Sequence, residues 1–176
     1  MGLDAVINGL ADAGIAYQGV IYAGMMITRD GPKVLEFNCR FGDPETQPVL
    51  MRLESDLVEI MEAVVDRRLH EQEIVWSNNA SVCIVIASGG YPGNYEKGEV
   101  IMGIDQVTEA EVFHAGTRFD GGEITTNGGR VLGVTALGKS IGEAIRTAYA
   151  AVEKIDFTGM QYRKDIGQKA LAKKRD

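Results

Sequence analysis

The sequence predicts an α+β protein built from two consecutive units, residues 1–70 and 71–176. Early in the chain, two apolar runs joined by a short turn predict a β-hairpin. Two later segments repeat apolar residues at spacings of three and four, as amphipathic helices do. Between these helical segments lie several short β-rich runs separated by glycine-rich turns, and they predict that the second unit is mostly antiparallel.

The first unit is expected to begin with a helix over residues 3–13, closed by Gly14. Strands over 17–28 and 33–41 follow, joined by a turn, and form the predicted hairpin. Next comes a helix with one apolar stripe and with Ser55 as its expected N-cap. The stripe consists of Leu57, Ile60, Met61, Val64 and Val65.

The second unit follows a polar stretch over 71–79. Its predicted strands are 80–88, 100–104, 111–115, 123–127 and 130–137. A last helix closes the unit, with Ser140 and Glu143 forming the expected capping box at its start. The buried face of this helix is expected to consist of Ile141, Ile145, Ala148, Tyr149, Val152 and Ile155.

Composition excludes several classes of function. The formal net charge of -7 argues against a nucleic-acid-binding surface, which needs a basic patch. No apolar run approaches the roughly 20 residues that cross a bilayer, so no membrane partner is expected. Cys39 and Cys83 lie far apart in sequence, which indicates neither a zinc site nor a disulfide framework. We therefore expect a cytoplasmic protein.

One predicted strand carries a row of side chains suited to chemistry. Along residues 35–41, strict alternation presents Glu36, Asn38 and Arg40 on one face, with about 7 Å between successive members. The opposite, apolar face is expected to be core and consists of Leu35, Phe37, Cys39 and Phe41. The row is equally compatible with the ordinary polar face of a half-exposed hairpin.

A carboxylate beside an amide oxygen suits Mg²⁺, which takes oxygen ligands and completes its shell with water and phosphate oxygens. Glu36 and Asn38 are therefore the candidate metal ligands. Arg40 lies one pleat further, where its guanidinium can stabilise charge on a phosphoryl group. The polar turn that follows contains Asp43 before Pro44, which favours chain reversal and also fits substrate recognition at a strand end.

These residues belong to a longer stretch with a specific resemblance. Residues 33–48 closely resemble the signature of the phosphoribosylamine–glycine ligases, which are ATP-grasp enzymes. Further segments similar to that family are 17–24, 90–98, 129–135 and 157–167. The resemblance implies the second half of an ATP-grasp domain over 1–70 and a small, mostly antiparallel α+β C-terminal domain over 71–176.

The resemblance also implies an activity. The parent ligase would join glycine to 5-phosphoribosylamine in purine synthesis, converting ATP to ADP and phosphate through glycyl phosphate. By the family pattern, Glu36 and Asn38 match ligands of Mg²⁺ (or Mn²⁺), Arg40 matches a catalytic arginine near the transferred phosphoryl group, and Asp43 matches a substrate contact. Members of the family are more than twice as long, so this chain is expected to be a C-terminal fragment, inactive without its N-terminal half.

Two other interpretations remain open at this point. The chain can instead be a non-catalytic scaffold, the partner half of a split enzyme. Residues 133–140 also match the P-loop pattern GxxxxGK[ST], which predicts an independent NTPase that uses Lys139. Against that second interpretation, Val134–Leu137 are strand-forming residues, and Ser140 is already expected to cap a helix.

Overall fold

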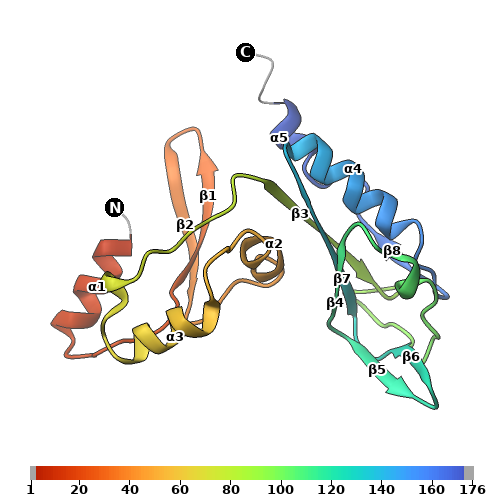
Figure 1. Ribbon diagram of the computed structural model, residues 1–176, viewed down its shortest axis with the longest axis horizontal. Coiled ribbons are helices and arrows are strands. Elements are labelled where there is room, and N and C mark those ends of the chain that lie inside the picture. Colours follow the sequence, from red (N-terminus) through yellow and green to blue (C-terminus); the bar gives the residue numbers. More distant parts are fainter. Residues whose placement is uncertain (1–2, 173–176) are drawn as a thin grey trace. The chain divides into compact units, whose positions relative to one another are not determined.

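A computed structural model describes residues 3–172, which form two compact units by spatial contact (Figure 1). Unit 1 contains the described residues up to Asp43 together with Leu53–Trp76. Unit 2 contains Pro44–Arg52 and the described residues from Ser77 onward. The chain therefore enters unit 2, returns to unit 1 and leaves it again. The predicted domains, 1–70 and 71–176, rest on sequence character and remain a prediction.

Unit 1 contains the predicted helices and the predicted hairpin. Its helices are α1 (Leu3–Asp12) and α3 (Leu57–Val65), and a short 3₁₀ turn, η1, covers Leu69–Glu71. The hairpin pairs β1 (Tyr22–Thr28) antiparallel with β2 (Gly31–Asn38). Both strands are shorter than predicted, because pairing starts only at Tyr22 and ends at Asn38.

A bulge interrupts the hairpin next to the candidate metal ligands. Gly24 pairs with Glu36 and Met25 pairs with Val34, so Leu35 is an extra residue in β2. Such an insertion bends a strand and redirects side chains. The strict alternation expected from residue 35 is therefore broken at its first position, whereas Glu36 to Asn38 keep regular pairing.

The cap of α3 differs from the prediction. Asp56, not Ser55, is the N-cap, because its carboxylate accepts hydrogen bonds from the N–H groups of Val58 and Glu59. Ser55 instead holds the incoming loop, with its hydroxyl accepting from the Val75 N–H at 2.7 Å. At the other end, the Gln18 amide donates to the carbonyls of Val64 and Val65, in the last turn of the helix.

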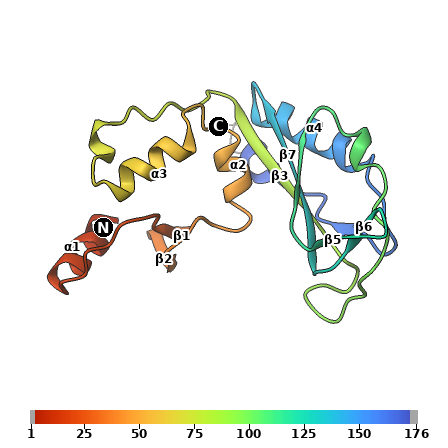
Figure 2. The same ribbon diagram turned by 60° about the horizontal axis from the view of Figure 1, so that its bottom comes forward.

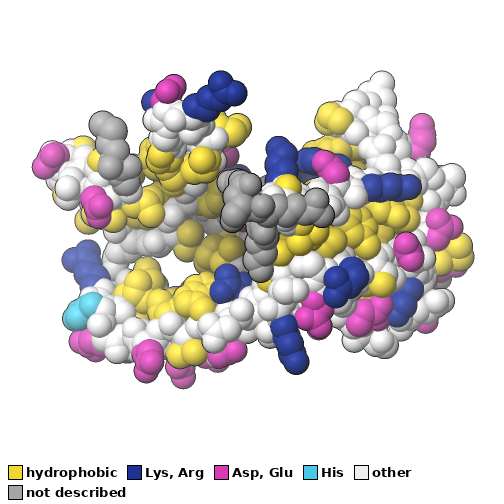
Figure 3. Space-filling view, turned by 90° about the horizontal axis from the view of Figure 1, so that it is seen from above, with side chains coloured by type: hydrophobic (Ala, Val, Ile, Leu, Met, Phe, Trp, Pro, Cys, Tyr) yellow, Lys and Arg dark blue, Asp and Glu magenta, His cyan; other side chains and the backbone are white. Residues whose placement is uncertain are grey.

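The expectation that the apolar face of β2 is core is wrong for this chain. Leu35 is 64% exposed and Phe37 is 46% exposed. Cys39 is also exposed. The reason is that, within the described part of unit 1, no other helix or strand packs extensively on the β1–β2 hairpin. Apolar side chains consequently gather at the surface of this unit (Figure 3).

Unit 2 is an antiparallel sheet with a helix on one face (Figures 1 and 2). The strand order is β4 (Glu111–His114), β7 (Arg130–Gly138), β3 (Ala80–Ala87) and β8 (Gln161–Tyr162). A separate hairpin pairs β5 (Thr117–Asp120) with β6 (Glu123–Thr126). The helical elements are α2 (Thr46–Leu50), η2 (Ile104–Gln106), α4 (Ile141–Val152) and α5 (Gln168–Ala172).

Most predicted strands of unit 2 are confirmed, but one predicted strand does not form, and the strands β5 and β8 were not predicted. The predicted strand 100–104 forms only isolated bridges, Val100 to Thr125 and Met102 to Asp156. The strand β5 was not predicted, because its four residues contain a single large apolar side chain, Phe119, and that side chain is 74% exposed. The partner strand β6 does reach the core, because Ile124 packs against it and Thr126 is buried.

The core of unit 2 lies between α4 and the sheet. Ser140 is the N-cap of α4, as predicted, since its Oγ accepts from the Glu143 N–H. The return bond of the predicted capping box differs, because the Glu143 carboxylate accepts from the Lys139 N–H in place of the Ser140 N–H. Fully buried side chains include Ile84, Ile86, Val134, Ala148 and Val152. Of the predicted helix face, Ile141 and Tyr149 are only half-buried.

None of the helices in residues 3–172 has the length and apolarity that a bilayer crossing requires.

The other face of β7 buries polar atoms that lack partners. Among the described residues, Gln47 Oε1, Ser81 Oγ and Thr135 Oγ1 are buried without a hydrogen bond. Thr135 lies directly opposite Cys83 in the β3–β7 pairing, and its side chain is fully buried. A buried hydroxyl without a partner costs about 1–3 kcal/mol.

We expect Thr135→Val to raise the free energy of unfolding by about 1 kcal/mol, because the change keeps the shape and removes an unpaired polar atom. Chemical denaturation of the two proteins measures this. Thr126→Val is the matched control: Thr126 is equally buried, but its hydroxyl accepts from the Glu99 N–H, so stability should fall. Destabilisation of both variants to the same extent would show that Thr135 has a partner such as an ordered water.

Candidate functional site

The candidate metal ligands lie together at the end of β2. The Asn38 amide donates to Glu36 Oε1 at 2.9 Å, so the two side chains share one face of the strand. Gly24 lies opposite Glu36 on β1, and a Cβ built on this glycine would lie 3.1 Å from Glu36 Cγ. The absence of a side chain at Gly24 therefore leaves room for the carboxylate over the neighbouring strand.

The chemistry of this pair fits Mg²⁺. A half-turn of the Asn38 amide would exchange its nitrogen for its oxygen and give two adjacent oxygen donors. Among the described residues, no group of three or more His, Cys, Asp or Glu side chains could hold a metal ion. Two protein oxygens, completed by water and phosphate oxygens, are a coordination that Mg²⁺ commonly adopts.

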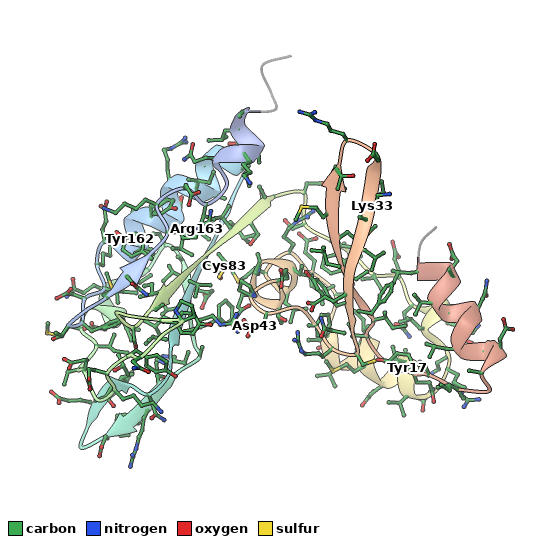
Figure 4. All side chains as sticks on the ribbon, turned by 180° about the vertical axis from the view of Figure 1, so that it is seen from behind. Tyr17, Lys33, Asp43, Cys83, Tyr162 and Arg163 are labelled. Carbon is green, nitrogen blue, oxygen red and sulfur yellow. The ribbon has the colours of Figure 1, made fainter. Side chains whose placement is uncertain are left out.

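Arg40 and Asp43 lie beyond the strand end. The Arg40 guanidinium donates to the Phe41 carbonyl at 2.7 Å, so it is held by its own neighbour and not by the Glu36–Asn38 pair. Asp43 is an exposed residue of unit 1, and the next residue, Pro44, belongs to unit 2 (Figure 4). The structure thus brings two of the four predicted residues together, and the roles of all four remain predictions.

Cys39, expected to be a small core residue, instead lies beside Tyr17. The Tyr17 hydroxyl donates to the Val20 carbonyl at 2.8 Å. Partial desolvation, followed by the hydrogen bond and charge interaction with Cys39, raises the pKa of Tyr17. This contact joins the segment before β1 to the residue that follows β2.

The P-loop interpretation is wrong. Residues 133–138 lie within β7, which pairs with β3 on one side and with β4 on the other. Their backbone amides are committed to an extended strand and cannot converge on a phosphate group. Lys139 follows the strand directly, and Ser140 caps α4, as described above.

Sequence reasoning missed a pocket of about 650 Å³ in unit 2. Its floor is the sheet face away from α4, where Cys83, Val85 and Ala87 alternate along β3. Tyr91 and Pro92 line it as well. The sequence contains no signal for this pocket, because β3, β8 and the start of β7 are far apart in sequence and become neighbours only through sheet pairing.

Comparisons with protein families match both parts of the chain. Residues 81–169 match the model of the phosphoribosylglycinamide synthetase C domain. Residues 2–46 match the model of the ATP-grasp (A) domain of the same synthetase. The second match contains Glu36, Asn38, Arg40 and Asp43, and the first contains the sheet and α4.

Individual relatives agree with these matches. Phosphoribosylamine–glycine ligase from Vibrio vulnificus is 55% identical over 170 residues, which are 95% of this chain and 40% of the relative. The enzyme of the same name from Caldanaerobacter subterraneus is 52% identical over 164 residues, 93% of this chain and 39% of the relative. A crystal structure of phosphoribosylamine–glycine ligase from Thermotoga maritima superposes with a TM-score of 0.78 at 34% identity, covering 92% of this chain and 40% of that one. The chain thus spans about 40% of the length of the curated relatives it matches.

Because residues 133–138 form a strand, Lys139→Ala is expected to leave any affinity of the chain for magnesium-ATP within about twofold of its original value, as for other surface substitutions. Calorimetric titration of both proteins provides the measurement. Arg146→Ala, on the exposed side of α4, controls for the loss of one surface cation. A tenfold weaker affinity in Lys139→Ala alone would contradict the strand assignment.

Proposed function

The chain belongs to the phosphoribosylglycinamide synthetase family, and on that basis we propose that it works as the C-terminal part of an ATP-dependent carbon–nitrogen ligase. The complete enzyme would join glycine to 5-phosphoribosylamine, giving glycinamide ribonucleotide, ADP and phosphate in purine synthesis. The observation that carries this proposal is the Glu36–Asn38 pair, positioned by β2 within the segment that matches the ATP-grasp domain.

In this proposal, Glu36 and Asn38 hold a magnesium ion, which would neutralise charge on the phosphate groups of ATP. Arg40 would release the Phe41 carbonyl and donate to the oxygens of the transferred phosphoryl group. A hydrogen bond from a guanidinium to a charged phosphoryl oxygen is stronger than one to a neutral carbonyl. Asp43 would contact the amine or the hydroxyl groups of the substrates. The residues of this chain thus orient groups and stabilise charge, and the glycine carboxylate would be activated as glycyl phosphate.

The proposal requires further polypeptide. This chain matches the ATP-grasp domain over residues 2–46 and the C domain over residues 81–169. The complete ligase would contain further segments that help to enclose ATP. Apolar side chains such as Leu35 and Phe37 are exposed on the hairpin that carries the candidate ligands. We propose that the N-terminal part of the ligase covers this face and supplies the remaining contacts to ATP.

A chimera tests the proposed function directly. This chain would replace the matching 40% of the Vibrio vulnificus ligase, to which it is 55% identical. An active chimera, with ligation measured as glycine-dependent release of ADP, supports the proposal. A folded chimera without activity would favour the alternative of a non-catalytic scaffold.

Within the active chimera, Glu36→Ala is expected to lower kcat by about 100-fold or more, because a metal that stabilises the transition state contributes several kcal/mol. Raising the magnesium concentration should restore part of the activity. Glu62→Ala, an exposed glutamate on α3, is the control and should leave kcat unchanged. Near-normal activity of Glu36→Ala at ordinary magnesium concentration would contradict the metal assignment.

A further inference from the structure

Gly24 lies on β1 directly opposite Glu36, one of the two candidate metal ligands. We propose that Gly24 is a positioning residue, which fixes the Glu36 carboxylate and thereby sets the selectivity of the site for Mg²⁺ over larger divalent cations. This inference deepens the proposed function, because it takes Glu36 and Asn38 as the ligands of the metal. The contact between Gly24 and Glu36 rests on the hairpin alone.

Gly24 is the one buried residue of the two hairpin strands, and every other residue of β1 and β2 is half-buried or exposed. Directly opposite residues of an antiparallel pair share a face, so the Glu36 side chain lies on the side where a Cβ of residue 24 would be. The atoms nearest to a Cβ built on Gly24 all belong to Glu36: Cγ at 3.1 Å, the carbonyl oxygen at 3.7 Å and the backbone nitrogen at 3.8 Å. Glu36 therefore rests on the bare backbone of β1.

The backbone conformation of Gly24 does not itself require glycine. Its φ lies outside the left-handed region, unlike that of Gly31 in the hairpin turn, which has a φ of 91°. An alanine at position 24 could thus adopt the same φ without strain. A glycine inside a strand also occurs where another group approaches the backbone closely, and here that group is the Glu36 side chain.

The bulge in β2 begins at the same place. The register shifts between Gly24 and Met25, so the extra residue Leu35 immediately precedes Glu36. A bulge of this kind redirects the neighbouring side chain. On the other side of Glu36, the Asn38 amide donates to Oε1 at 2.9 Å. The carboxylate is thus positioned by Gly24 across the pair and by Asn38 along its own strand, in the hairpin where Figure 4 labels Lys33.

A methyl group at position 24 would displace the Glu36 side chain. The 3.1 Å between a built Cβ and Glu36 Cγ is shorter than the usual carbon–carbon contact of about 3.5–4.0 Å. The Glu36 Cγ would have to move by a few tenths of an ångström, and the carboxylate would move with it. The net charge of the site would stay the same, so any change in metal binding would come from geometry.

This displacement should affect different cations unequally. Mg²⁺ demands near-ideal octahedral geometry with oxygen ligands at about 2.0–2.1 Å, whereas Ca²⁺ accepts flexible geometry at about 2.3–2.6 Å. Glu36 is exposed on its outer side, so its carboxylate is accessible to a metal ion. A carboxylate moved away from its place beside Asn38 therefore weakens Mg²⁺ binding more than Ca²⁺ binding.

The first experiment examines the metal-free 176-residue chain by NMR. Gly24→Ala should shift the side-chain amide signals of Asn38, while nuclear Overhauser effects between Ala23 and Phe37 show that the hairpin still forms. Gly9→Ala is the matched control, because Gly9 also lies outside the left-handed region and a Cβ built on it meets nothing within 4 Å. Unchanged Asn38 signals in Gly24→Ala would overturn the positioning role.

The second experiment measures selectivity in the same chain. Mn²⁺ should broaden the side-chain amide signals of Asn38, and Mg²⁺ and Ca²⁺ then compete with it. Gly24→Ala should weaken Mg²⁺ binding by about 10-fold or more, as substitutions around metal ligands commonly do. The ratio of the Mg²⁺ to the Ca²⁺ concentration that removes half of the broadening should rise about threefold or more. An unchanged ratio would overturn the selectivity, and no broadening at Asn38 would contradict the metal assignment.

A double variant distinguishes positioning from a general effect on the fold. In Glu36→Ala the Cγ that a methyl group at position 24 would meet is absent, so adding Gly24→Ala should leave the Asn38 signals of Glu36→Ala unchanged. In the active chimera, the residual kcat of Glu36→Ala should likewise not fall further. A further fall by the same factor that Gly24→Ala causes alone would show that Gly24 acts independently of Glu36.

The chimera also separates this inference from the proposed function. In an active chimera, Gly24→Ala should raise the Mg²⁺ concentration for half-maximal ligation by about 10-fold, with a smaller effect on kcat at saturating Mg²⁺. A changed Mg²⁺-to-Ca²⁺ ratio in the chain together with an inactive chimera would support the role of Gly24 and contradict the ligase. An active chimera whose Mg²⁺ requirement is unaffected by Gly24→Ala would support the ligase and overturn the role of Gly24.

Discussion

The burial of β7 on both faces is the constraint on which unit 2 depends. Val131, Val134 and Ala136 are buried, and α4 packs against this strand and its neighbour β3. On the opposite face, α2 packs on the same two strands, and Gln47 lies close to Gly133. A strand covered on both sides cannot slip in register without exposing apolar side chains. The register of β7 therefore fixes the positions of the strands that pair with it and of the helices that pack on it.

This constraint carries over from the fold to chemistry. The floor of the unit 2 pocket is one face of β3, and α2 follows directly after the turn that contains Asp43. The candidate metal ligands depend on a different support, the bulged β1–β2 hairpin.

The sequence predicted local structure well wherever local signals were sufficient. The helices α1, α3 and α4, the hairpin and the capping by Ser140 all follow from periodicity and capping residues. Ser55 and Asp56 are both good caps, and the choice between them depended on a loop 18 to 20 residues away. The bulge at Leu35 depends on how β2 pairs with β1, and the exposure of Phe37 depends on the lack of an element packed over the hairpin. Neither can be read from the alternation of apolar and polar residues.

The interleaving of the two units has a consequence for the evolution of such genes. Segment Pro44–Arg52 belongs with the sheet of unit 2, although residues 53–76 separate it from that sheet in sequence. A single crossover between two related genes within codons 53–76 would therefore combine α2 from one parent with β3 and β7 from the other. Mismatched packing of that kind disfavours the recombinant, so inherited breakpoints should be depleted in this interval and the two units should be transmitted together.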